Sequence, residues 1–243
     1  MDFRLAPLVV APFAGSFLGV LILRLPAEGL LASARSACPH CGAVLRPRDL
    51  VPILSYLTLR GRCRHCGKRI AAFYPGAEIA ALAIAGSACF VAADPLWLWA
   101  DCVLGWGLLA LGWIDARTRL LPDVLTLPLL ALGLMATAWL SPEDIAEHAL
   151  AAAVGVTSFL AVAAAYRRLR GQDGLGMGDA KLLGVAGAWL GLAALPRVVF
   201  AAALLGILAA GAWRLSGRPI AATTAIPFGP FLALAIWAAR LLG

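Results

Sequence analysis

Charged residues are scarce in this sequence of 243 residues. Asp, Glu, Lys and Arg together make up 14% of the chain, whereas 62% of its residues are hydrophobic, and the mean hydropathy is +0.89. These values exclude an ordinary water-soluble domain. Carboxylates are the rarer charge, with 13 Asp and Glu in all, so a carboxylate at the mouth of an apolar segment is a functional candidate by default.

Two common hydrolase signatures are also absent. The chain contains neither an HExxH nor a GxSxG sequence, which removes the common zinc-protease and serine-hydrolase alternatives.

Long apolar runs are abundant instead. About 20 apolar residues cross roughly 30 Å of hydrocarbon as a helix. The sequence therefore predicts an all-α polytopic membrane protein of about eight transmembrane helices, at residues 5–23, 77–93, 96–114, 124–140, 147–165, 181–196, 197–213 and 226–242. Pro26 is expected to end the first helix, which lacks a polar cleavage region and is interpreted as a retained helix rather than a signal peptide.

The distribution of cations predicts the orientation of these spans. With eight spans and Met1 outside, 17 of the 20 Lys and Arg fall in inside loops, as the positive-inside rule requires. The net charge of +7 then needs no nucleic acid to explain it. We expect both termini outside and the long polar segment 27–75 in the cytoplasm.

That polar segment contains two CxxC pairs separated by 21 residues, each followed by a glycine. Such pairs can close a tetrahedral four-thiolate zinc site, here from Cys38, Cys41, Cys63 and Cys66. A redox dithiol is the alternative, and a reducing compartment disfavours disulfides. His40 and His65 could replace a cysteine ligand but are expected to be surface residues.

Two aspartates mark the cytoplasmic ends of predicted spans. Asp115 ends the third span and Asp179 precedes the sixth, 64 residues later, so both are expected at the same membrane depth. Two carboxyls sharing one proton can hydrolyse a peptide bond, because one activates water while the other donates a proton to the carbonyl. In this catalytic interpretation, Gly176 and Gly178 would let a substrate backbone approach Asp179. The alternative is that Asp179 is a helix N-cap.

Other carboxylates compete for these roles. Asp123 is expected to cap the fourth span and Asp173 to be solvated, whereas Asp101 is interpreted as structural. Glu78, at the cytoplasmic end of the second span, could cap or snorkel, or face the cysteine loop or a bound ligand.

Two other classes of protein stay open: a zinc-stabilised membrane scaffold whose aspartates are caps, and a small transporter, which would instead place carboxylates near the bilayer midplane.

Several long motifs of the chain resemble those of type IV prepilin peptidases, the bifunctional leader peptidase/N-methyltransferases of type IV pilus and type II secretion systems. The resemblance runs through GSFL (15–18), RLP (24–26), both CxxC pairs, DLVPILSYLTLRGRC (49–63), YPGAE (74–78), IDARTRLLPDVLTLPLL (114–130), GMGDAKLLGVAGAWLG (176–191) and IPFGPFLA (226–233). It thus covers nearly the whole chain.

The resemblance implies an aspartic endopeptidase of the bacterial inner membrane, with Asp115 and Asp179 as its catalytic pair, that cleaves the basic leader of prepilins or pseudopilins on the cytoplasmic side. It also implies methylation of the new N-terminal residue with S-adenosylmethionine. The cysteine loop, with structural Zn²⁺, is associated with methyl transfer, and Gly61 matches a glycine linked to that activity. Gly61 and Glu78 are thereby expected near the cofactor.

On this basis we expect a first helix at 1–26, a tetracysteine loop at 27–75 and a transmembrane peptidase domain at 76–243. The chain departs from the family's usual residues at Gly19, Phe73 and Asp173, none of which touches the aspartate pair. No glycine loop of the Rossmann type signals adenosylmethionine, so methyl transfer rests on the resemblance alone.

Overall fold

The structure, a computed structural model, describes residues 4–28, 36–92, 94–171, 176–216 and 226–243. Within these ranges the chain is helical, apart from loops and two isolated antiparallel bridges. Helix is the expected outcome for an apolar chain, because it satisfies backbone polar groups within each segment. The elements are α1 (Leu5–Glu28), η1 (Pro47–Asp49), α2 (Leu54–Thr58), α3 (Phe73–Val91), α4 (Pro95–Thr118), α5 (Asp123–Leu140), η2 (Pro142–Asp144), α6 (Ile145–Arg170), α7 (Met177–Leu190), α8 (Ala194–Leu215) and α9 (Gly229–Leu242).

The predicted fold class is confirmed. Each of the eight predicted spans coincides with a helix, and six helices in the described part of the chain are long and apolar enough to cross a membrane. The other two, α7 and α9, have 14 residues each and rise only about 21 Å. The protein is therefore a multi-pass membrane protein, whose described residues include six long apolar helices and two helices of 14 residues.

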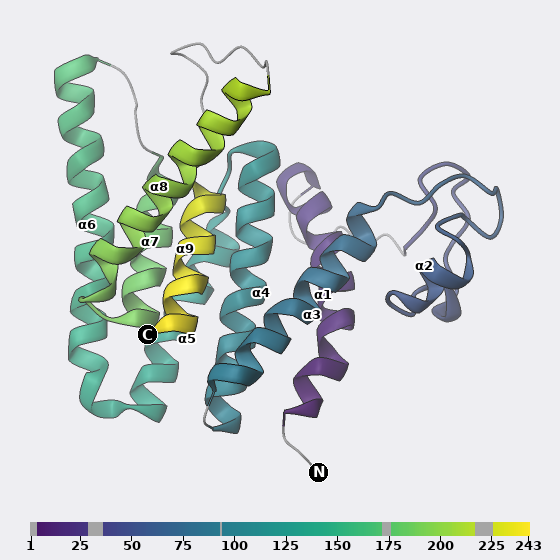
Figure 1. Cartoon of the computed structure of the whole chain (residues 1–243), viewed down its shortest axis with the longest axis horizontal. Helices are drawn as coiled ribbons and strands as arrows, with labels where there is room; N and C mark the ends of the chain where they lie inside the picture. The colour runs from purple at the N-terminus through teal and green to yellow at the C-terminus, as the bar shows by residue number, and fades with distance from the viewer. Residues whose placement is uncertain (1–3, 29–35, 93, 172–175, 217–225) are drawn as a thin grey trace. The chain divides into compact units, whose positions relative to one another are not determined.

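Contacts divide the chain into two compact units, residues 1–110 and 111–243. In the first unit α1 packs along α3, and the cysteine loop that joins them carries η1 and α2 (Figure 1). The first part of α4 belongs to this unit as well, where the indole N–H of Trp106 donates to the carbonyl of Ala81 at 3.1 Å.

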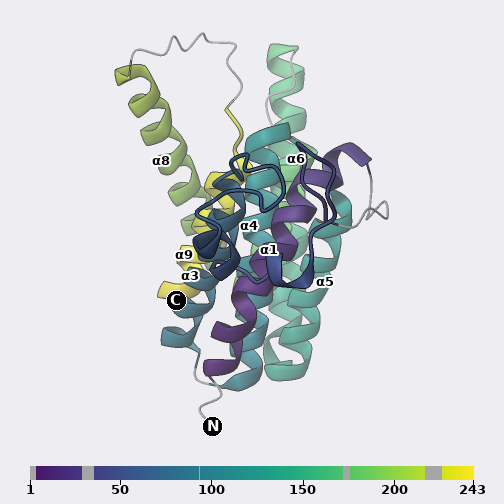
Figure 2. The ribbon, with the colours of Figure 1, turned by 90° about the vertical axis from the view of Figure 1, so that its right-hand side faces the viewer.

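In the second unit α7 is the central helix, packed against α5, α6, α8 and α9 (Figure 1). Its residues 182–189 are all buried. By contrast, the buried residues of α8 lie in its first half, and the second half leans outward (Figure 2). The short α7 is thus enclosed by its neighbours, and its two ends are set by contacts inside the unit.

Several helix ends differ from those predicted, among them the end of α7, which lies at Leu190 and not at residue 196. α1 continues past Pro26 to Glu28, and α6 runs to Arg170, five residues beyond the predicted end of its span. Three arginines lie in the last turn of α6, where cations interact favourably with the helix dipole. The helix therefore extends beyond its apolar run.

Candidate active site and cysteine cluster

Asp115 lies in the last turn of α4 and is 6% exposed. Its Oδ2 accepts a hydrogen bond of 3.0 Å from the backbone N–H of Gly229, the first residue of α9. The first N–H groups of a helix have no partner within that helix, so the start of α9 supplies a donor that fixes one oxygen of this buried carboxyl.

Close approach explains why residue 229 is glycine. A Cβ atom there would lie 2.7 Å from Oδ2 of Asp115 and 2.9 Å from its Cγ. The preceding Phe228 packs its ring against Phe159 of α6, with 6.4 Å between ring centroids. The start of α9 is thus held by a ring contact on one side and by the Asp115 carboxylate on the other.

Asp179 lies in the first turn of α7, half-buried, in the same unit as Asp115. The two carboxyls interact electrostatically. The N-cap of α7 is Gly176, and Asp179 is the third residue of the helix. The structure therefore places the two predicted aspartates near each other, and the alternative in which Asp179 is the N-cap is wrong.

The glycines before Asp179 serve contacts within the chain. A Cβ atom on Gly178 would lie 2.7 Å from the Cβ of Leu121, in the segment between α4 and α5. A Cβ atom on Gly176 would lie 3.4 Å from Oδ2 of Asp179. Gly178 thus brings the start of α7 against the segment between α4 and α5, where the sequence suggested room for a substrate backbone.

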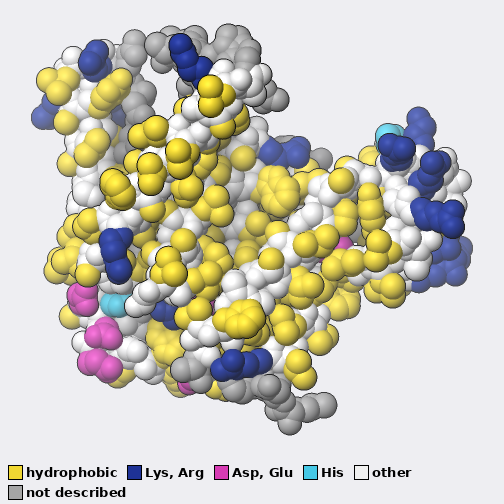
Figure 3. Space-filling view, in the orientation of Figure 1, with side chains coloured by type: hydrophobic (Ala, Val, Ile, Leu, Met, Phe, Trp, Pro, Cys, Tyr) yellow, Lys and Arg dark blue, Asp and Glu magenta, His cyan; other side chains and the backbone are white. Residues whose placement is uncertain are grey.

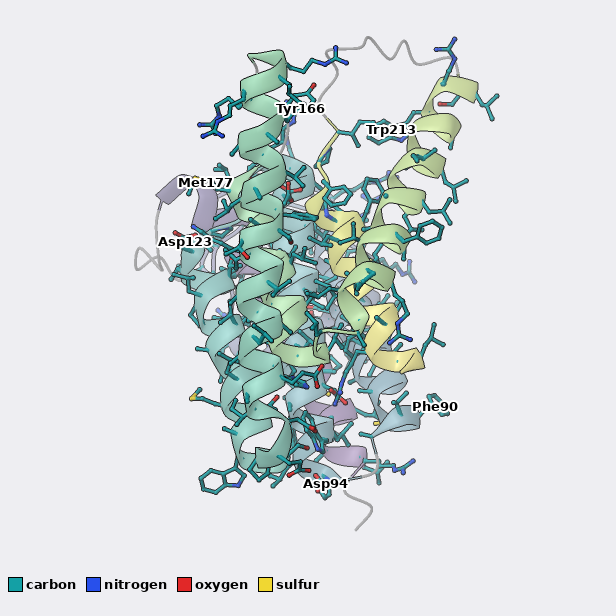
Figure 4. All side chains as sticks on the ribbon, turned by 90° about the vertical axis from the view of Figure 1, so that its left-hand side faces the viewer. Phe90, Asp94, Asp123, Tyr166, Met177 and Trp213 are labelled. Atoms are coloured by element: carbon teal, nitrogen blue, oxygen red, sulfur yellow. The ribbon has the colours of Figure 1, made fainter. Side chains whose placement is uncertain are left out.

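The other aspartates considered in the sequence, where the structure describes them, differ from Asp115 and Asp179 in their surroundings. Asp123 was expected to cap α5, but it is the first residue of that helix and the N-cap is Pro122, so the expectation is wrong. Its carboxylate pairs with the ammonium of Lys181 from α7. Figure 4 shows Asp123 and Met177 toward the same end of the bundle. The Asp123 side chain is 56% exposed, unlike Asp115. Asp101 is buried in α4, and Asp173 lies outside the described residues.

The four predicted cysteines form one cluster. Their sulfur atoms all lie within 4.8 Å of one another, and the Sγ atoms of Cys38 and Cys66 are 3.9 Å apart. Zn–S bonds of about 2.3 Å in a tetrahedron place sulfur atoms about 3.8 Å apart. All four are free thiols, so the residues fit a four-thiolate zinc site.

The two CxxC turns have matching backbone geometry. Gly42 N–H donates to the carbonyl of Cys38 and Gly67 N–H to that of Cys63, both at 2.9 Å. Each glycine has a positive φ, 69° and 68°. His40 and His65 are exposed and lie outside the cluster, as expected of surface residues.

The two cysteines of the first CxxC pair differ in acidity: at Cys41 the Ala43 N–H is outweighed by burial and by hydrogen bonds with the other three thiols, which raise the pKa of the Cys41 thiol to about 11, whereas Cys38 favours thiolate. The backbone N–H groups of His40 and Cys41 lower the pKa of the Cys38 thiol to about 6, and thiolate is the form that binds zinc. Arg64, beside Cys63, forms a 2.8 Å ion pair with Asp49 and holds the pKa of that carboxyl below its usual value. This pair ties the second CxxC turn to the segment that follows the first.

Gly61 and Glu78 belong to the framework of the cysteine loop. Gly61 has φ +66°, and a Cβ atom there would lie 2.9 Å from the ring of Tyr56. Glu78 is 7% exposed, and its Oε2 accepts a 2.6 Å hydrogen bond from the N–H of Ile53. Ile53 itself has φ 60°, which is rare for a β-branched residue. Of the open interpretations of Glu78, the one in which it faces the loop agrees with this contact.

Two residues of these sites escaped sequence reasoning. Gly229 lies within the IPFGPFLA motif, but nothing in that motif indicates Asp115 as its partner. Ile53 has no sequence signal for a positive φ, a conformation that usually selects glycine.

Comparison with known proteins places both sites within family domains. Residues 9–92, with the four cysteines, match the bacterial peptidase A24 N-terminal domain. Residues 102–211, with both aspartates, match the type IV leader peptidase family. No solved structure matches the chain.

Curated relatives cover most of the chain. A prepilin leader peptidase/N-methyltransferase of Pseudomonas aeruginosa is 37% identical over all of this chain and 91% of its own length. Proteins of the same name from Burkholderia pseudomallei and Dichelobacter nodosus are 44% and 40% identical over 86% of this chain, and over 67% and 71% of their own lengths. On this evidence the chain belongs to the type IV leader peptidase family.

Proposed function

We propose that this protein is a prepilin leader peptidase and N-methyltransferase, in which Asp115 and Asp179 hydrolyse the peptide bond that joins leader to prepilin. The observation that carries the peptidase proposal is the pair of interacting carboxyls at the meeting of α4, α7 and α9. Membership of the family and the printed names of the relatives support the substrate class.

In the proposed mechanism the two carboxyls hold one proton between them. The ionised carboxyl removes a proton from a water molecule, whose oxygen attacks the scissile carbonyl carbon, while the protonated carboxyl donates its proton to the carbonyl oxygen. Collapse of the tetrahedral intermediate breaks the C–N bond, and the departing amine takes up a proton from the dyad. The Gly229 N–H donates to Oδ2 of Asp115, so in this mechanism Oδ1 is the oxygen that would act on the water.

The names of the relatives support methyl transfer, for which S-adenosylmethionine is the proposed donor. Gly61 and Glu78 were expected near it, but both contact the loop itself. We therefore derive no step of methyl transfer through either residue and assign them to holding the loop in shape.

Zinc is the proposed metal of the cysteine cluster. Cys38, Cys41, Cys63 and Cys66 would hold it as thiolates, and in such a closed four-ligand site the ion contributes to folding rather than to chemistry.

We place the protein in the bacterial inner membrane, with the cysteine loop and the dyad facing the cytoplasm. The concentration of Lys and Arg in the loops on that side supports this orientation. The functional division into residues 1–26, 27–75 and 76–243 is part of the same proposal.

Replacement of either dyad carboxyl tests the peptidase proposal. In Asp115→Asn or Asp179→Asn, we expect leader cleavage of a co-expressed model prepilin to fall by about 10²–10⁴-fold, because an amide cannot exchange the proton that catalysis requires. The measurement is mass spectrometry of the prepilin, which reports cleavage and methylation together.

Asp123→Asn is the matched control, because it removes an exposed carboxylate at the same end of the bundle. We expect it to cleave normally. If the dyad aspartates only stabilised helices, each substitution would cost about 0.5–2 kcal/mol of stability and leave cleavage intact. Normal cleavage by either dyad variant would contradict the proposal.

Metal analysis tests the zinc site. Purified protein should hold about one zinc equivalent, and changing both cysteines of either CxxC pair to serine should remove it, because a structural site needs all four ligands. His40→Ala and His65→Ala should keep the metal. A wild-type protein purified without zinc, or retention after loss of a cysteine pair, would refute the site.

A further inference from the structure

The cysteine loop exposes an apolar surface that the proposed activities leave unexplained. Four side chains around η1 and α2, termed here the apolar face, are 37–65% exposed: Leu50, Val51, Leu54 and Leu57. Leu54 and Leu57 are three residues apart on α2 and thus lie on one side of this helical turn. Contiguous exposed apolar side chains outside a membrane span mark an interaction surface.

Arginines flank this face in the sequence. Arg46 and Arg48 precede it and Arg60 and Arg62 follow it, all exposed. In the described part of the loop, residues 36–72, seven Lys and Arg stand against a single acidic residue, Asp49, which already pairs with Arg64. Figure 3 shows these cations gathered over the loop. The partner of the apolar face must therefore accept apolar side chains at its centre and carry negative charge around them.

The backbone of the apolar face is held in place by contacts with α3. Ile53, between Val51 and Leu54, is held at its positive φ by the buried carboxylate of Glu78 from α3. Pro52 is buried. The backbone between the apolar side chains is thus anchored to a helix that crosses the membrane, and the loop is joined to such helices at both ends, α1 and α3.

We propose that the apolar face docks the cysteine loop on the anionic phospholipid surface of the membrane that α1 and α3 cross. Leu54 and Leu57 would enter the boundary between headgroups and acyl chains, while the flanking arginines contact lipid phosphates. Nucleic acid offers no apolar counterpart to these leucines. A basic leader peptide, the substrate class proposed above, is repelled by the same arginines. An anionic bilayer surface offers both apolar contacts and negative charge, and the connections of the loop to α1 and α3 keep the loop close to it.

Hydrogen exchange of the full-length protein in lipid nanodiscs tests this docking. Discs of phosphatidylcholine are compared with discs in which part of that lipid is replaced by phosphatidylglycerol. A helix as short as α2 opens readily in water, so exchange of its amides reports whether something covers it. We expect the amides of residues 53–60 to exchange about tenfold more slowly in the anionic discs. The difference should vanish at about 1 M salt, where the Debye length falls to roughly 3 Å.

The double variant Leu54→Ser/Leu57→Ser should lose this lipid-dependent protection. Val44→Ser, which removes an apolar side chain that is 51% exposed and follows the first CxxC turn, should keep it. Unchanged exchange at Gly42 and Gly67, whose amides close the two turns, shows that the loop remains folded in both variants. Equal exchange in the two kinds of disc would overturn the proposal, and slow exchange in both would assign the face to a protein contact instead. Protection that survives in the double variant would overturn it too.

Discussion

At the scale of single residues, the two aspartates of the candidate active site could be predicted from the sequence, whereas the glycine that contacts one of them could not. Asp115 and Asp179 could be predicted because carboxylates are rare beside apolar runs and are costly there. Gly229 could not, because its contact with Asp115 joins residues 114 positions apart and depends on where α9 begins. Glycine at 229 is explained by the space that the Asp115 carboxylate occupies, which only the folded chain defines.

Gly229→Ala should therefore impair leader cleavage without unfolding the protein. The added Cβ atom would fall 2.7 Å from Oδ2 of Asp115, so the carboxylate must move, and displacement of a catalytic group by about 1 Å can cost 10²-fold in rate. The rate of cleavage of a model prepilin by purified protein is the measurement.

Gly211→Ala is its control, because a Cβ atom at this α8 position has open space around it. Alanine is also the better helix former at both positions, so loss of helix stability cannot account for a defect at 229. A fully active Gly229→Ala enzyme would show that the close approach to Asp115 has no role in catalysis.

At the scale of elements, apolar runs predicted where helices lie but not how long they are. The eight runs each became a helix, because a membrane leaves no other way to satisfy the backbone of an isolated segment. The ends follow other rules: α6 is extended by arginines in its last turn, and α7 stops at Gly191, whose φ is +76°. The CxxC spacing predicted the cysteine cluster for a similar reason, since it encodes two local turns. The contact that holds α2 to α3, from the Ile53 N–H to Glu78, could be anticipated in the sequence only from the position of Glu78.

Glu78→Ala should loosen α2 without removing α3 from the membrane. The Ile53 N–H would lose its carboxylate acceptor, and a hydrogen bond to a charged group contributes about 1.5–3 kcal/mol. We expect faster hydrogen exchange across residues 53–61, with that loss in the free energy of local opening.

The variant Glu78→Gln keeps an oxygen that can accept the same hydrogen bond, so it should retain most of the protection. Exchange that is equally slow in wild type and in Glu78→Ala would show that the loop is held by other contacts.

At the scale of the whole molecule, orientation in the membrane is encoded by charge and not by contacts. Of the 20 Lys and Arg, 17 fall on one side of the predicted topology, while the connection between α5 and α6 on the other side carries Glu143, Asp144 and Glu147. In this predicted topology the basic loops and the two aspartates share one side.

Reporter fusions at chain positions of known depth test this orientation. Alkaline phosphatase, which folds only outside the cytoplasm, should be active after Gly243 and within residues 141–144, and inactive within residues 167–171. A fluorescent protein that folds only in the cytoplasm should give the opposite pattern, because cations are retained inside. Phosphatase activity at 167–171 would reverse the topology.

The shortness of α7 has a consequence for the supply of water. The C-terminal end of α7 is fixed beside the start of α6, where His148 contacts the Ala188 carbonyl and Glu147 accepts the N–H of Leu192. From that level α6 continues for 26 residues but α7 for only 14. About 21 Å of helix against about 30 Å of hydrocarbon leaves a shortfall of roughly 9 Å, and it falls at the end that carries Asp179. We therefore expect a hydrated depression in the bilayer above the two aspartates, through which water and an extended peptide would reach the carboxyls proposed to be catalytic.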